Sequence, residues 1–374
     1  MKLSQAKIIL KPTIIFVLST LFFICCKSAK QAFPPDLEAR LDKIFASAPG
    51  FSGVLLVAEK GKPVYHKAFG YKSFITKEPM ETSTIFELAS VSKQFTAMTI
   101  MQMKEAGKLS FDDPIERYIP GLPYSGITIR HLLTHTSGLP DYQQVMDEHW
   151  DKSKIAGNVD NIAYLIQYHP AKHFEPGDKY EYSNTGFMLL ASITEKVSGE
   201  DFIEYCRKRF FVPAKMTSTD IRTIDQKKKL RNLALGHIYV KDEQRYVPAD
   251  SFPQYNYAIW LGNRKGPGRV SSTSEDLLKW DRLLYSNTLV KDSTLKEAFS
   301  PARLKDGSVS NYGFGWKIKE SKKGKVVWHD GDNPGYATEF IRYIDADKTI
   351  ILLCNNAHVK MPDILKSVES IVEE

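Results

Sequence analysis

The spacing of apolar residues along the chain follows two periods, one helical and one extended. In "DLEARLDKIFASA" the apolar residues Leu37, Leu41, Ile44 and Phe45 share one face of a helix. In the next stretch, "SGVLLVAEKGKPVYHKAFG", two apolar runs flank residues 59–62, a pattern typical of a β-hairpin. These two patterns predict that the chain begins with a helix followed by two strands.

The middle of the chain has a helical pattern and its end returns to strands. Phe95, Met98 and Met101 recur at helical spacing, which places Ser90 at or near a helix N-terminus. Helical runs then alternate with Pro- and Gly-rich loops over roughly residues 96–265. Near the end, "KVVWHDG", "GYATEFIRYI" and "KTIILLCNN" resemble strands, and "PDILKSVESIVEE" resembles a helix. These patterns predict a sheet built from both ends of the chain, with a helical region inserted between them.

The first 25 residues have the features of a secretory signal peptide. Three lysines precede an apolar stretch over residues 14–24, which is too short to span a bilayer comfortably. The stretch ends at Cys26 and resembles a loose bacterial lipobox, although Phe23 stands where a leucine is usual. We therefore expect an exported protein, periplasmic or anchored in the outer membrane through a lipid on Cys26. Plain secretion and an uncleaved anchor remain alternatives.

The composition is that of a globular protein with a core of full size. Of the 374 residues, 43% are hydrophobic and 25% are charged, so disorder is not expected. The formal net charge is +7, and the one dense basic run is "KKKLR", residues 227–231, which a solvated loop or helix end explains. Because no basic stripe is interleaved with aromatic residues, we expect no nucleic-acid partner.

Neither the cysteines nor the histidines form the pattern of a metal site. Cys206 and Cys354 are the only cysteines beyond the first 26 residues, and we expect two buried thiols rather than a disulfide. His131 and His135 have the spacing of a metal-binding pair, but residue 132 is a leucine where a zincin has glutamate. These patterns give no indication of a metal site.

The stretch "ELASVSKQFTA" contains the candidate catalytic pair. Ser90 and Lys93 are three residues apart, so they lie on the same face of a helix. A serine hydroxyl is a weak nucleophile that needs a base. A lysine can serve as that base only when burial or a neighbouring cation lowers its pKa. Taken alone, the tetrapeptide is more typical of a capping serine and a surface lysine.

Two further segments change that interpretation. The segment "DKYEYSNTGFMLL" contains Tyr182 and Asn184. A buried tyrosine can relay or hold a proton, and an asparagine amide can orient both a lysine and a substrate. The segment "VVWHDGDNPGYATEF" places "HDG", residues 329–331, on a predicted strand. A glycine there, Gly331, would let a substrate backbone approach closely.

Together these segments resemble the serine β-lactamase and penicillin-binding-protein superfamily. Within it, the chain is most similar to the branch of class C β-lactamases, DD-peptidases and esterases. Each segment is modest evidence alone, but they run in family order and cover roughly residues 36–370. The matching segments are "ELASVSKQFTA", "ITIRHLLTHTSGLPDY", "FEPGDKYEYSNTGFMLL" and "WHDGDNPGY", with support from "GRVSSTSEDLLKW" and "YGFGW".

The resemblance implies an α+β protein of β-lactamase-like fold, with an antiparallel sheet flanked by helices and an inserted, mostly helical domain. We expect the sheet domain to comprise residues 36–95 and 266–374, and the helical domain to comprise residues 96–265. The active site would lie at their interface. Residues 1–25 would be the signal peptide, and residues 26–35 would be a tether.

The resemblance also implies a role for each site residue. Ser90 would attack a carbonyl and form an acyl-enzyme, with Lys93 and Tyr182 sharing the role of base and Tyr182 protonating the leaving group. Asn184 would hydrogen-bond Lys93 and the substrate amide. The backbone N–H groups of Ser90 and Asp332 would form the oxyanion hole. His329 and Gly331 would contribute to substrate binding. No metal or cofactor would be needed, and the segment that carries His131 and His135 would be structural.

The third motif departs from the Lys-Thr-Gly that is frequent in the family. Here it is His329, Asp330 and Gly331, and a histidine first is common in peptidase and esterase members. A threonine in second place would hydrogen-bond a substrate carboxylate, whereas an ionised Asp330 would repel it. One hypothesis is therefore that substrates with this carboxylate are handled poorly. The alternative is that Asp330 points away or pairs with His329.

We therefore predict a β-lactamase-related serine hydrolase that cleaves an amide, peptide or ester bond of a small-molecule or peptide substrate. One alternative keeps the site but deacylates slowly, as a penicillin-binding DD-peptidase of the cell wall does. A non-enzymatic alternative is a β-lactam sensor or scaffold. The scaffold is disfavoured because Ser90, Lys93, Tyr182 and Asn184 are all present.

Overall fold

An antiparallel sheet of six strands is the framework of the structure, a computed structural model that describes residues 33–374. The proposed signal peptide and Cys26 lie outside the described residues. The strand order is β12-β13-β14-β15-β1-β2, and β1 lies antiparallel to β15, with Val54 opposite Leu353. The sheet is therefore built from both ends of the chain, as predicted. Its strands are β1 (Gly53–Glu59), β2 (Lys62–Phe69), β12 (Lys317–Ser321), β13 (Gly324–Asn333), β14 (Tyr336–Tyr343) and β15 (Lys348–Cys354).

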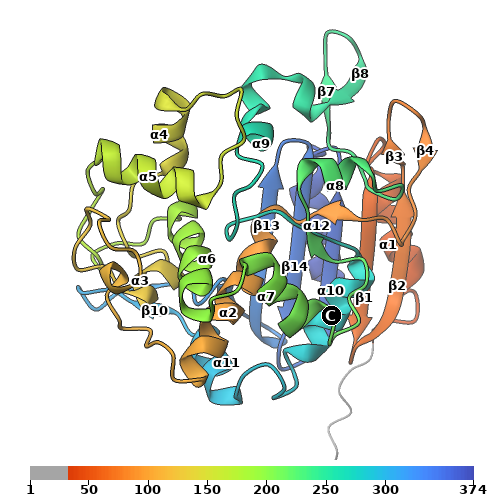
Figure 1. The fold of residues 1–374 in the computed structure, drawn as a ribbon. Helices are drawn as coiled ribbons and strands as arrows, with labels where there is room; N and C mark the ends of the chain where they lie inside the picture. The colour runs from red at the N-terminus through yellow and green to blue at the C-terminus, as the bar shows by residue number, and fades with distance from the viewer. Residues whose placement is uncertain (1–32) are drawn as a thin grey trace, which may run out of the picture. The chain divides into compact units, whose positions relative to one another are not determined.

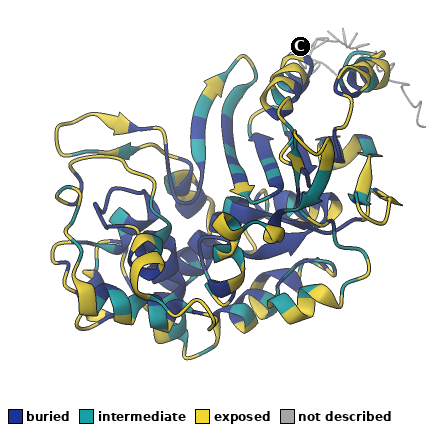
Figure 2. Cartoon of the chain, turned by 90° about the horizontal axis from the view of Figure 1, so that it is seen from above, coloured by how far each residue is buried: buried dark blue, intermediate teal, exposed yellow. Residues whose placement is uncertain are grey.

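Each face of the sheet packs into its own hydrophobic core, because successive side chains of a strand point to opposite faces. On one face, residues such as Leu55 and Leu352 pack against α1 (Leu37–Ala46) and α12 (Met361–Val372). On the other face, residues such as Leu56 and Leu353 belong to the core that contains α2 (Lys93–Glu105) and α10 (Ser274–Leu283). Figure 2 shows buried residues concentrated on the strands and on the inward faces of helices.

The remaining helices come from the middle of the chain and from the segment before β12. Figure 1 shows α3 to α6 gathered to one side of the sheet, with α2 beside it. The predicted limits of a separate helical domain, 96 and 265, stay a prediction. These helices are α3 (Ile129–Leu133), α4 (Tyr142–His149), α5 (Asn158–Tyr168), α6 (Asn184–Ser198), α7 (Phe202–Cys206), α8 (Ile224–Lys228), α9 (Tyr257–Trp260) and α11 (Asp292–Ala298).

Several short strands were not predicted from the sequence. They are two to four residues long and pair partly with distant segments, so no local period marks them. One small sheet joins β5, just before Ser90, to β9 and β6. The short strands are β3 (Tyr71–Ser73), β4 (Glu78–Pro79), β5 (Phe86–Glu87), β6 (Asp220–Ile221), β7 (His237–Val240), β8 (Arg245–Pro248), β9 (Val270–Ser272), β10 (Ala302–Arg303) and β11 (Val309–Ser310).

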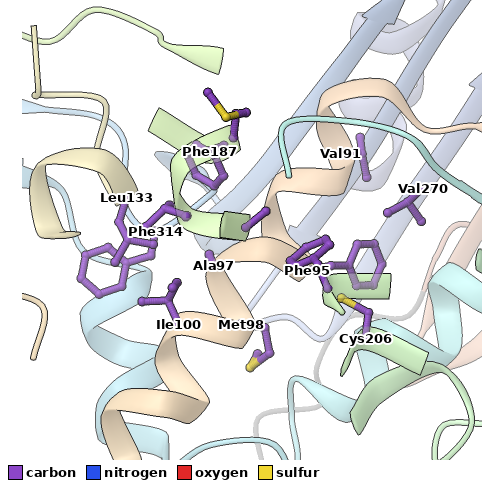
Figure 3. Packing of buried hydrophobic residues seen from close by; sticks show 14 of the residues in the cluster. Val91, Phe95, Ala97, Met98, Ile100, Leu133, Phe187, Cys206, Val270 and Phe314 are labelled. Atoms are coloured by element: carbon purple, nitrogen blue, oxygen red, sulfur yellow. The ribbon is translucent and has the colours of Figure 1, made fainter. Parts of the chain in front are cut away.

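Helix α2 is buried on nearly all sides. Figure 3 shows Phe95, Met98 and Ile100 packed among side chains from other helices and loops. Its buried polar groups also have partners: the Trp280 Nε1–H donates to Gln94 Oε1 at 2.6 Å, and Thr96 Oγ1 donates to the Gly266 carbonyl at 2.7 Å. A helix fixed on all sides gives its first residues a defined position.

Two smaller predictions concern single side chains. Cys206 and Cys354 are both free and buried, which confirms the expectation of two thiols without a disulfide. The basic run was expected to be solvated, and for Lys227 this is wrong. Its side chain is only 13% exposed and pairs with Glu87, and burial lowers its pKa to about 8.

Candidate active site

Ser90 lies on a single 3₁₀ turn, Ala89–Ser92, directly before α2. Ala89 has φ 48°, a left-handed conformation that costs energy for a residue other than glycine. Ser92 is buried and accepts a hydrogen bond from the Val270 N–H at 3.1 Å, so it supports the turn. Ser90 borders a cavity of ≈ 100 Å³ lined also by Gln143, Asn184, Tyr257, Arg264, Arg269 and Asp332, among others.

Lys93 lies beneath Ser90 and is completely buried. Its Nζ is 3.1 Å from Ser90 Oγ, 2.9 Å from Asn184 Oδ1 and 3.0 Å from the Pro267 carbonyl oxygen. The amide and carbonyl oxygens can only accept hydrogen bonds, so they take the two N–H groups of a neutral amine. In a neutral amine the lone pair would then face the Ser90 hydroxyl, which would donate to it across the 3.1 Å contact.

The surroundings of Lys93 favour that neutral amine. Burial holds the pKa of Lys93 well below its usual range, and the positive charge of Arg264 lowers this pKa further. Within residues 33–374 no carboxylate forms an ion pair with Lys93. A lysine can serve as a base when burial or a neighbouring cation lowers its pKa, and Lys93 has both.

Tyr182 directly precedes Ser183, the N-cap residue of α6, and is 38% exposed. Lys93 Nζ is 4.6 Å from the centroid of its ring. Desolvation of the phenol raises the pKa of Tyr182, and an interaction with the Ser90 hydroxyl opposes part of that rise. Tyr182 therefore holds its proton at neutral pH.

Asn184 is positioned by the N-terminus of α6. The preceding residue, Ser183, caps this helix by accepting a hydrogen bond from the Gly186 N–H at 3.2 Å. The cap fixes the first helical residue, Asn184, so that its Oδ1 accepts from Lys93. The amide nitrogen of Asn184 has no partner among the described residues and borders the cavity.

Strand β13 completes the site along its last five residues. Strand β12 pairs with β13 only as far as Trp328, so residues 329–333 pair with β14 alone. The side of the strand that β12 leaves open bears Asp332, which is exposed and borders the cavity with Ser90. Ser90, Lys93, Tyr182, Asn184 and Asp332 are thus brought together from three distant segments.

Comparison with known proteins shows which family the chain is similar to. The sequence model of the Beta-lactamase family matches residues 41–369. The chain is 41% identical to Penicillin-binding protein 4* of Bacillus subtilis (strain 168), covering 86% of this chain and 72% of that protein. It is 24% identical to D-aminopeptidase of Brucella anthropi, over 85% of this chain and 59% of that protein.

The chain belongs to the Beta-lactamase family.

Solved structures agree on the fold. A penicillin-binding protein from Bacillus halodurans superposes with a TM-score of 0.76 and 27% identity, covering 88% of this chain and 98% of that one. A D-amino acid amidase from Ochrobactrum anthropi SV3 superposes with a TM-score of 0.72 and 22% identity, covering 90% and 98%. The family and the α+β, β-lactamase-like fold expected from the sequence are confirmed, and the protein is a serine hydrolase.

His329 was expected to contribute to substrate binding, but it is not among the residues that line the cavity beside Ser90. It is 1% exposed, and its two ring nitrogens are both engaged. Nδ1 is 2.5 Å from the Asp330 carbonyl oxygen, so it must carry the hydrogen, and Nε2 accepts from the Tyr312 hydroxyl at 2.9 Å. Burial, followed by the charge of Lys93, holds the pKa of His329 well below its usual range. A neutral His329 therefore positions Tyr312 and leaves no open atom for a substrate.

Gly331 is required by the packing of the chain itself. A Cβ atom there would lie 2.3 Å from the Leu88 carbonyl oxygen and 2.4 Å from Thr338 Oγ1. The Thr338 hydroxyl already donates to that same Leu88 carbonyl at 2.9 Å. The missing side chain lets β13 pack directly against the turn that carries Ser90.

Asp330 lies on the sheet face opposite His329, since neighbouring side chains of a strand alternate. It forms an ion pair with Lys317 of β12, and hydrogen bonding to Lys317 contributes to a lowered pKa of Asp330. The expected alternatives were repulsion of a substrate carboxylate, or a side chain that points away or pairs with His329. The side chain points away, but its partner is Lys317, which offsets its charge.

Four residues at the site were not singled out for it from the sequence: His135, Tyr312, Arg264 and Arg269. The ring of His135 is buried 4.4 Å from the Tyr182 centroid, and its Nδ1 accepts from the Ser183 N–H at 3.1 Å. The expected structural role of this histidine is thus specific, because it supports the segment that carries Tyr182. The segments "YGFGW" and "GRVSS" carried the family pattern, and this was the available signal for Tyr312 and Arg269.

Replacing Gly331 with alanine tests the contact between β13 and the Ser90 turn. Because the added methyl group meets backbone at 2.3 Å, we expect a loss of about 1–3 kcal/mol in the free energy of unfolding. We also expect a fall in the rate of Ser90 acylation, since the turn must shift. Urea unfolding and labelling with a fluorophosphonate measure the two effects.

The matched control is Gly157→Ala. A Cβ at Gly157 meets no atom closer than 3.6 Å, and its φ of −120° suits alanine. This variant should unfold and acylate nearly as the unmodified protein does. Equal behaviour of the two variants would show that the contact does not constrain the turn.

Proposed function

We propose that this protein is a penicillin-binding-type serine hydrolase, which cleaves a peptide or amide bond through an acyl-enzyme on Ser90. The observation that carries the proposal is the buried Lys93 amine, 3.1 Å from Ser90 Oγ and without an ion-pair partner in the described chain. Such an amine is a base at neutral pH. The 41% identity to a penicillin-binding protein supports the same class of substrate.

In the acylation step, the Lys93 lone pair takes the Ser90 proton as Oγ attacks the substrate carbonyl. The negative charge on the carbonyl oxygen would be met by the N–H groups of Ser90 and Asp332, and each such donor is worth about 2.7–4 kcal/mol. The Tyr182 phenol then gives its proton to the leaving nitrogen, and the proton held by Lys93 replaces it. The products are the acyl-enzyme and a free amine.

Deacylation reverses the same proton path. A water molecule attacks the acyl carbonyl while Lys93 or Tyr182 takes one of its protons, and Ser90 Oγ leaves as its own proton is returned. The acid product and the resting enzyme result. The rate of this second step separates a β-lactamase, which turns over quickly, from a penicillin-binding protein, which keeps the adduct.

A second candidate is an aminopeptidase that takes a free ammonium group, as one relative's name suggests. The specific observation is the exposed Asp332 carboxylate beside Ser90, which forms no ion pair among residues 33–374. A substrate ammonium could pair with it. Turnover of D-alanine p-nitroanilide, compared with its N-acetylated form, would distinguish this activity from the first.

The first experiment is an intact-mass time course of the protein with a penicillin. We expect an adduct of the mass of the drug that persists, and none in Ser90→Ala, because the variant lacks the nucleophile. The drug remaining is read from the same spectra. Intact drug and no adduct would overturn the penicillin-binding proposal.

The pH dependence of acylation tests the role of Lys93. Only the neutral amine can act as base, so the rate should rise with pH through a pKa well below 10.5 and then reach a plateau. The plateau should extend to high pH because the pKa of Tyr182 is raised. Lys93→Arg places a permanently charged group at this position that cannot lose a proton, so acylation should fall by about 10²- to 10⁴-fold. If Lys93→Arg showed the same rise in acylation rate with pH, that rise would belong to the titration of another group.

We propose in addition that the protein is exported and anchored by a lipid on Cys26. The three lysines, the apolar stretch of residues 14–24 and the position of Cys26 support this. Metabolic labelling with a fatty-acid analogue should mark the native chain but not Cys26→Ser. Cys25→Ser is the matched control and should remain labelled. Absence of label from the native chain would contradict the proposal.

A further inference from the structure

Two arginines beside Ser90 have no ion-pair partner among residues 33–374. Arg264 and Arg269 both line the cavity that contains Ser90. Arg264 makes one side-chain hydrogen bond, from Nη1 to the Tyr142 hydroxyl at 2.6 Å. Arg269 also makes one, from Nη1 to the Ala258 carbonyl at 3.1 Å. Neither guanidinium forms an ion pair with any residue of the described chain.

Several of their remaining N–H groups have no hydrogen-bond partner in the described part of the chain. The Nε of Arg264, and the Nε and Nη2 of Arg269, are buried without a hydrogen-bond partner within residues 33–374. A buried, unsatisfied charged donor is costly, and proteins normally pair it. Elsewhere this chain does so: the fully buried Arg342 donates to Asp281 at 2.6 Å. Arg342 also keeps one Nη1 without a hydrogen-bond partner, but it has a carboxylate partner, which neither Arg264 nor Arg269 has among the described residues.

The backbone at Arg269 carries a second cost. Its φ is 82°, in the left-handed region that favours glycine. Arginine at such a position is strained, and strained residues persist where the side chain is needed. The preceding residue, Gly268, lies next to both the Ser90 turn and Arg264: a Cβ there would be 3.7 Å from the Ala89 carbonyl oxygen and 3.8 Å from Arg264 Nη2, which is ordinary van der Waals contact.

The two acids of the same cavity form no ion pair with either arginine. Glu87 pairs with Lys227. Burial lowers the pKa of Arg269, and the charge of Glu87 acts favourably on Arg269 and opposes part of that lowering. Asp332 lines the cavity but forms no ion pair with either arginine. The cavity thus retains two guanidinium groups whose open N–H groups match the geometry of a carboxylate, which a guanidinium can bind through two parallel hydrogen bonds.

The position of the cavity identifies the part of the substrate that would enter it. In the proposed mechanism Tyr182 protonates the leaving group, so the leaving group lies on the Tyr182 side of Ser90. The cavity is lined by Asn184, Arg264 and Arg269, and Tyr182 is not among its lining residues. The acyl part of the substrate, on the other side of the scissile bond, would therefore extend toward the arginines.

We propose that Arg264 and Arg269 form a subsite for a carboxylate carried on the acyl part of the substrate. The proposal rests on the acyl-enzyme function proposed above and names its substrate class: acyl groups that end in a carboxylate. The carboxylate would accept hydrogen bonds from the open N–H groups and supply the counter-charge that the chain lacks.

Three thioesters with one common leaving group test this subsite. Their acyl chains have equal length and end in a carboxylate, a carboxamide or an ammonium group. We expect the native protein to favour the carboxylate over the carboxamide by about 10- to 100-fold in kcat/KM, the usual range for hydrogen bonds to a charged group. In Arg269→Gln this ratio should fall toward one.

Two further variants separate a binding role from a folding role. Arg269→Gly removes the guanidinium and relaxes the backbone, so it should fold well and still lose the carboxylate preference. Arg303→Gln is the matched control, because Arg303 is exposed and lies on another surface, and it should keep the native ratio. Thermal unfolding of each variant checks that the fold is retained.

The outcomes are distinct for the two proposals. Equal turnover of carboxylate and carboxamide by the native protein, or a ratio unchanged in both Arg269 variants, would overturn the carboxylate subsite while leaving the hydrolase intact. Preference for the ammonium substrate would also overturn it and would favour binding at Asp332. No turnover of any thioester, together with no Ser90 adduct, would overturn the proposed function itself.

Discussion

The burial of one lysine amine, without a carboxylate to pair with it, is the constraint on which the rest of this site depends. Lys93 Nζ is held by Ser90, by Asn184 at the start of α6, and by the Pro267 carbonyl. These contacts come from three segments that are distant in sequence. Each supplies an oxygen and none supplies a negative charge, so the amine is solvated by dipoles alone. A buried amine in such surroundings is more stable without its extra proton, and that is the state in which it can act as a base.

The groups around this amine keep the site short of negative charge. His135 and His329 lie beneath Tyr182, and burial lowers the pKa of both, so they remain neutral. Two acids near the site are engaged elsewhere, since Asp330 pairs with Lys317 and Glu87 pairs with Lys227, while Asp332 borders the cavity and forms no ion pair with Lys93. These two ion pairs surround the site, and neither of them includes Lys93 or Ser90. Arg264 adds a positive charge from the cavity, which lowers the pKa of Lys93 further.

The sequence predicted those parts of the fold and the site that depend on local spacing. Helix α1, the β1–β2 hairpin and strands β13 to β15 all followed from periods of apolar residues, and the Ser90–Lys93 pair followed from one helical turn. What sequence could not predict depends on contacts between distant segments. The role of Gly331 required knowing that β13 crosses the Leu88 carbonyl. Packing likewise determines how exposed Tyr182 is and which partners the two nitrogens of His329 have. Neither property can be predicted from the type of residue alone.

The same reasoning links the unpaired arginines to the cost of building the site. A left-handed φ at Arg269 and open donors on both arginines lower the stability of the free protein, and no contact within the described chain offsets them. Lys93 adds a further cost of the same kind, because its burial is also uncompensated by charge. A substrate that brings a carboxylate into the cavity would relieve the first cost while it places its carbonyl at Ser90. Part of the binding free energy would then arise from a defect already present in the empty site, and a neutral acyl group of the same shape could not relieve it.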